Sequence, residues 1–83
     1  MDDVARLLEQ ARMAAARLER IHVDSLWARR AGGLRASLLR SIDLVERGPS
    51  PTRLAQLERL LQQGYTILTN AAREIPASPP QGK

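Results

Sequence analysis

Few side chains in this sequence could take part in catalysis, and they do not converge. There is one histidine, His22, and no cysteine, so the chain offers no metal site of ordinary composition and no disulfide. His22 is expected to cap or pack beside a turn. General acid–base catalysis needs two titratable groups held close together. Asp43 and Glu46 are three residues apart, but Arg40 and Arg47 surround them, which is typical of a solvated, ion-paired helix face. The sequence therefore predicts no catalytic residue, no metal and no cofactor.

A short resemblance to an enzyme family lies in the middle of the chain. The segment LRSIDLVER, Leu39 to Arg47, resembles the opening helix of the small, helical and dimeric chorismate mutases. In that family the helix opens the domain, whereas here it is central and too little chain follows it. No substrate-binding arginine of the family can be carried over, so a protein that is not an enzyme remains the expectation.

The basic residues are the feature with the widest functional reach. The formal net charge is +4, and all but one of the thirteen basic residues are arginine. An arginine-rich first hairpin could hold nucleic-acid phosphates or an acidic partner. Arginines also pair with acids on ordinary solvated surfaces, and no recognition-helix signature or aromatic stacking platform accompanies these. The candidate residues for binding a polyanion or a partner are Arg12, Arg17, Arg20, Arg29, Arg30, Arg35 and Arg40.

Composition and periodicity indicate the elements that would position these side chains. The chain has 83 residues, rich in Leu, Ala, Arg, Glu and Gln, which are strong helix formers. Apolar residues recur at steps of three and four over 2–22, 25–47 and 51–75, which predicts three amphipathic helices. The first two stripes are out of phase, which favours a hairpin at residues 22–24 over one long rod. Ser50 followed by Pro51 predicts an N-cap, and Gly48 suits the residue after a helix end.

The predicted architecture is all-α, an up-down-up three-helix bundle covering residues 1–75. Residues 76–83 are Pro-rich and are expected to form a disordered tail or a linker. A hairpin at 22–24 would place Gly32 and Gly33 opposite Ala14 and Ala15, which predicts a close crossing of the first two helices. A kink at the two glycines is the alternative.

A second apolar ridge on the third helix predicts self-association. Leu60 and Ile67 are seven residues apart, lie away from the main stripe, and have Ala71 nearby. Exposed in a monomer, this ridge would form a self-complementary patch, so a homodimer is expected.

The leading functional hypothesis is a non-catalytic helical interaction or oligomerisation module, N-terminal in a larger protein or system. The alternative is a small nucleic-acid-binding accessory protein that uses the arginine-rich hairpin. No apolar run reaches the roughly 18 residues that a membrane span requires, and no signal peptide is evident, so a cytoplasmic location is expected. No small-molecule ligand is implied.

Overall fold

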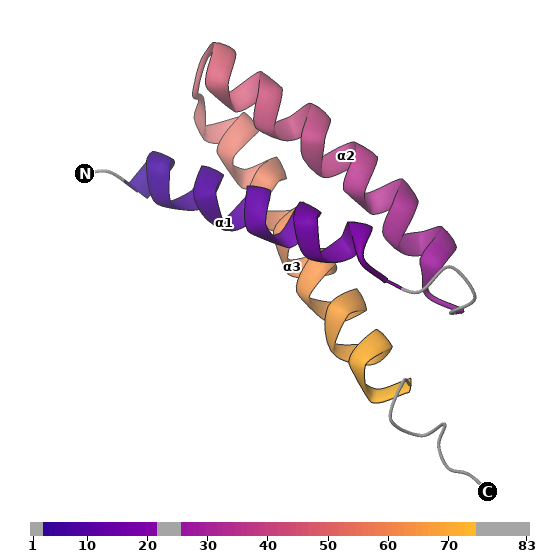
Figure 1. Cartoon of the computed structure of the whole chain (residues 1–83). Coiled ribbons are helices and arrows are strands. Elements are labelled where there is room, and N and C mark those ends of the chain that lie inside the picture. Colours follow the sequence, from indigo (N-terminus) through magenta and orange to yellow (C-terminus); the bar gives the residue numbers. More distant parts are fainter. Residues whose placement is uncertain (1–2, 22–25, 75–83) are drawn as a thin grey trace, which may run out of the picture.

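The fold is an all-α bundle of three helices, as the periodicity predicts. The computed structural model describes residues 3–21 and 26–74. Helix α1 spans Asp3–Glu19, α2 spans Ala28–Arg47 and α3 spans Pro51–Glu74, and each helix packs against both others (Figure 1). The predicted role of His22 and the predicted tail at 76–83 lie outside the described residues.

The first two helices form a hairpin, and its connection is longer than the sequence predicts. Helix α1 ends at Glu19 instead of residue 22, and α2 begins at Ala28 instead of residue 25. The residues after Arg20 are Ile21, His22 and Val23, which have lower helix propensities than the Leu, Ala and Arg before them. Trp27 occupies the N-cap position of α2 and makes no capping hydrogen bond with its side chain.

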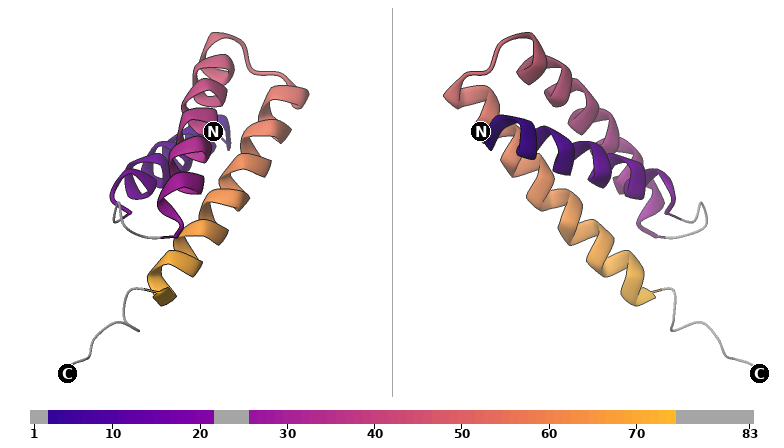
Figure 2. Two further views of the ribbon diagram at one scale, coloured as in Figure 1. Left: turned by 90° about the vertical axis from the view of Figure 1, so that its right-hand side faces the viewer. Right: turned by 60° about the vertical axis from the view of Figure 1, so that its left-hand side comes forward.

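Helices α2 and α3 run antiparallel from the short turn at residues 48–50. Helix α1 packs across both of them (Figures 1 and 2). The second half of α3 continues past the end of α1, so its last turns have fewer neighbours than its first turns (Figure 2). This overhang leaves part of the α3 surface without a covering helix.

The core lies where the three apolar stripes meet. Leu38, Val45 and Leu57 are its largest fully buried side chains. Among the described residues, Ser41 is the one polar residue that is buried, and every described ionisable side chain is exposed or half-buried. No described helix is long and apolar enough to cross a membrane.

The predicted close crossing at Gly32 and Gly33 is wrong. Both glycines are exposed on α2, and a Cβ built on either of them would meet no atom within 4 Å. The small residue at the crossing is Gly64 of α3, which is buried. A Cβ there would lie 3.7 Å from Leu18 Cδ1, 3.7 Å from Leu34 Cδ2 and 3.8 Å from Leu38 Cδ1. Gly64 therefore sits where side chains from α1 and α2 meet α3.

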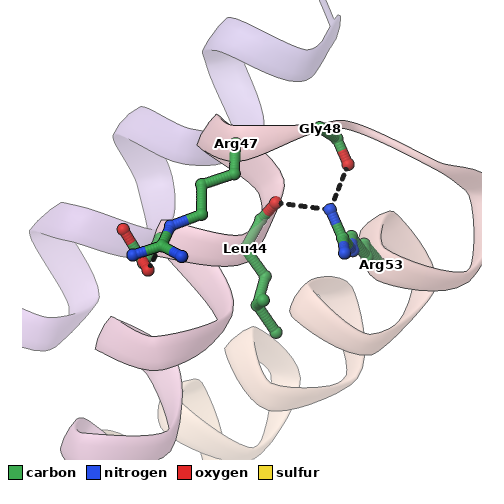
Figure 3. A network of polar contacts seen from close by, with 5 residues as sticks. Leu44, Arg47, Gly48 and Arg53 are labelled. Carbon is green, nitrogen blue, oxygen red and sulfur yellow. Dashed lines mark hydrogen bonds and ion pairs between the residues drawn. The ribbon is translucent and has the colours of Figure 1, made fainter.

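The turn between α2 and α3 is held from both sides. Ser50 Oγ accepts a hydrogen bond of 3.2 Å from the Arg53 backbone N–H, which confirms Ser50 as the N-cap of α3. Gly48 ends α2 in an extended conformation, with φ of −174°, and not in the left-handed one typical of such glycines. The guanidinium of Arg53 donates to the carbonyl oxygens of Leu44, at 3.1 Å, and Gly48, at 2.9 Å (Figure 3). One α3 side chain thus satisfies the carboxyl end of α2.

Candidate interaction surfaces

The ridge predicted to mediate self-association is part of the core of a single chain. Leu60 is 9% exposed and Ala71 is 4% exposed, while Ile67 is half-buried against the same apolar cluster. From periodicity alone, these residues lie outside the main apolar stripe of α3 and would be exposed in a monomer. The structure instead places this ridge within the packed side of the helix, so it is not available to a second copy.

An open groove lies on the other side of α3, between that helix and α1. It encloses about 820 Å³. Its lining is mixed: Leu7 of α1, the buried Leu61 of α3 and Tyr65 stand beside the charged residues Glu58 and Arg59. Tyr65 also lines a smaller hollow of about 230 Å³ further along α3, together with Thr66, Thr69 and Asn70. The two hollows make one irregular surface that continues past the end of α1.

The part of this surface after Arg59 on α3 belongs to the longest stretch of the chain without a charged residue. From Leu60 to Ala72 there is no Asp, Glu, Lys or Arg. Most of its exposed residues lie on the side of α3 opposite the Leu60 ridge, because a helix turns about 100° per residue. We call them the neutral face; they are Gln62, Tyr65, Thr69 and Ala72.

The neutral face carries no charged residue, in contrast to the outer surface of α2. There, the exposed residues Arg40, Asp43 and Arg47 give a charged surface of the ordinary solvated kind, with an Arg47–Asp43 ion pair of 3.0 Å. A solvated helix face without charge, carrying a tyrosine that is 38% exposed, has instead the composition typical of a protein interface. The sequence contained this signal, and apolar periodicity does not detect it.

Single charges of opposite sign stand at the two ends of the neutral face. Glu58 lies one turn before Gln62, and Arg73 directly follows Ala72. Both are exposed and neither has an ion-pair partner among the described residues. They are separated by about 22 Å along the helix axis. Tyr65 and Thr66 lie midway between them.

The structure divides the seven candidate arginines into two groups. Arg12 pairs with Glu46, and Arg35 pairs with Glu19 at 3.5 Å, so both are tied into contacts between α1 and α2. Arg40 donates to Ser37 Oγ at 3.3 Å on the outer side of α2. These three do not join the others in one patch.

The other four arginines lie where α1 ends and α2 begins (Figure 1). Arg17, Arg20 and Arg29 are exposed and form no ion pair with a described residue. The guanidinium carbon of Arg30 lies 5.1 Å from the centre of the Trp27 ring, a cation–π contact. We call this set, Arg17, Arg20, Arg29 and Arg30, the basic end.

Comparison with known proteins adds no family to this picture. No protein-family model, no curated protein and no solved structure matches the chain. Within the described residues, no group of three or more His, Asp or Glu side chains is placed to hold a metal ion. The neutral face and the basic end are therefore the two surfaces that can indicate a function.

Proposed function

We propose that this protein is a non-catalytic helical oligomerisation module whose partner is a second copy of itself, bound through the neutral face of α3. The supporting observation is that this exposed face carries no charge over three turns, yet is bounded by Glu58 at one end and Arg73 at the other. A surface with an uncharged centre can be desolvated at little cost, since burying an unpaired charge is what makes association expensive.

Symmetry supports a second copy over an unrelated partner. Consider two antiparallel α3 helices related by a two-fold axis near Tyr65 and Thr66. Residues that face each other then lie at equal distances before and after the axis, so position 58 of one copy faces position 73 of the other. Glu58 of each copy then faces Arg73 of the other, and Gln62 faces Thr69. The same arrangement places no like charges face to face across the uncharged centre.

The hollows beside α3 provide room for the second helix. The groove between α1 and α3 and the hollow around Thr69 both border the neutral face and share Tyr65. Tyrosine supplies a large contact area together with a hydroxyl that can stay hydrated at a rim. A contact restricted to one helix face per copy lies at the small end of stable interfaces, so the expected dissociation constant is in the micromolar range.

The test introduces charge into the neutral face without touching the core. Gln62→Glu with Thr69→Glu alters two exposed positions that face each other across the axis, and uses a good helix former. The wild type should sediment as a dimer at high micromolar concentration in analytical ultracentrifugation. The double variant should be a folded monomer with an unchanged helical circular-dichroism spectrum.

A matched control is available on the same helix. Gln56→Glu with Gln63→Glu adds the same charge at two exposed positions about 140° around α3 from the neutral face. This variant should remain dimeric. A monomeric wild type, or equal dissociation by both double variants, would overturn the proposal.

A further inference from the structure

We propose that the basic end is a binding site for the phosphate backbone of nucleic acid. The site consists of Arg17 on the last turn of α1, Arg20 directly after that helix, and Arg29 and Arg30 on the first turn of α2. None of these residues belongs to the neutral face, so the inference does not rest on self-association.

Positive charge is concentrated at this end of the molecule. Residues 17–35 contain five arginines against two acids, Glu19 and Asp24, and so hold three of the four net positive charges of the chain. Within that segment Arg35 is already paired with Glu19. The excess is thus carried by the four arginines of the basic end, and no described carboxylate pairs with them.

The local structure at the start of α2 supports a role in binding and not in stability. The first turn of α2 contains no acidic residue, and two of its residues are Arg29 and Arg30. Positive side chains are unfavourable there because the amino end of a helix already carries partial positive charge. Arg20 follows the end of α1 in a turn whose backbone N–H donates to Arg17 O at 3.0 Å, so two like charges lie three residues apart at this helix end. A bound polyanion would relieve both sources of repulsion.

The arrangement fits a nucleic-acid strand better than an isolated anion. Arg35 of α2 pairs with Glu19, the last residue of α1. Arg29 lies about 9 Å from Arg35 along the axis of α2, towards the start of that helix. The four arginines are therefore spread over two helix ends and can reach several successive phosphates, each of which would release a counterion. The contact of Arg30 with Trp27 also places a half-buried indole beside the site.

An anionic membrane surface is the competing ligand, because Leu26 next to the site is 83% exposed. A single exposed leucine is a small apolar anchor, since stable membrane attachment takes a broad apolar face or two separate signals. Four arginines that form no ion pair with a described carboxylate are the larger feature. We therefore assign the site to nucleic acid, and vesicles enter the test as a contrary result.

The experiment measures fluorescence anisotropy of a short labelled DNA single strand and the matching duplex over a range of salt concentrations. Binding by the wild type should weaken with salt, and the slope of log K against log salt should be about −3 to −4 for four neutralised phosphates. Arg20→Gln with Arg29→Gln should make this negative slope less steep by about 2. The affinity at about 0.1 M salt should fall by at least about tenfold. Its melting temperature should not fall, which separates lost binding from lost folding.

A variant with the same charge change elsewhere isolates the site. Arg6→Gln with Arg59→Gln removes two exposed arginines at the other end of the bundle and should keep the wild-type slope. Three results would each overturn the proposal. These are no wild-type binding to either DNA at low salt, equal loss in the two double variants, and binding to anionic phosphatidylserine vesicles without binding to DNA.

Discussion

At the scale of single residues, the three glycines inside helices have different roles although the sequence does not separate them. Gly32 and Gly33 face open space on α2. They therefore have the entropic cost of glycine in a helix, and no neighbouring atom requires the absence of a side chain. Gly64 is surrounded by Leu18, Leu34 and Leu38 from the two neighbouring helices. Packing at the crossing therefore depends on Gly64 and on the buried alanines of α1.

Substitution of the glycines should reveal this difference in thermal melts. Gly33→Ala should raise stability by about 0.5–1 kcal/mol, because alanine restricts the unfolded chain and meets no neighbour. Gly33→Leu should also be neutral or stabilising. Gly64→Leu should lower stability by about 1–3 kcal/mol, since its side chain must displace three packed leucines. A loss of stability in Gly33→Leu as large as that in Gly64→Leu would contradict the observed crossing.

At the scale of elements, the turn between α2 and α3 depends on a side chain that no local rule indicates. Ser50 and Pro51 are recognisable from the sequence as the start of a helix. The capping of α2 by Arg53 is not, because it requires the two helices to be folded back on each other first. The carbonyl oxygens of Leu44 and Gly48 then come within reach of one guanidinium (Figure 3).

Removing this cap should loosen the hairpin of α2 and α3. Arg53→Met keeps helix propensity and aliphatic length but loses both hydrogen bonds, so stability should fall by about 1 kcal/mol and the melting temperature by about 4–8 °C. Arg59→Met is the control, because Arg59 is exposed on the same helix and has no such bonds. Equal melting temperatures for the two variants would show that the cap contributes nothing.

The limits of sequence interpretation are clearest on α3. Periodicity and the Ser50-Pro51 pair correctly predict that the helix exists and that it starts at Pro51. Periodicity does not predict which flank of the stripe is covered, because that depends on where α1 crosses and where α1 ends. Periodicity therefore places Leu60 away from the main stripe, although the structure buries it.

At the scale of the whole molecule, the proposed dimer can be tested by exchanging charges across its two-fold axis. Glu58→Arg should weaken association about three- to tenfold, because it replaces two exposed ion pairs per dimer with two like-charge contacts. Arg73→Glu should weaken it by a similar factor. The combined variant restores both pairs with reversed polarity and should return the dissociation constant close to that of the wild type.

This exchange separates antiparallel pairing of α3 from other modes of association. Glu9→Arg on the exposed side of α1 makes the same charge change outside the neutral face and should leave the dissociation constant unaltered. Sedimentation equilibrium on all five proteins gives the comparison. Recovery in the combined variant requires that position 58 of one copy faces position 73 of the other. If instead the two single changes add, the helices do not pair about Tyr65 and the two-fold arrangement is wrong.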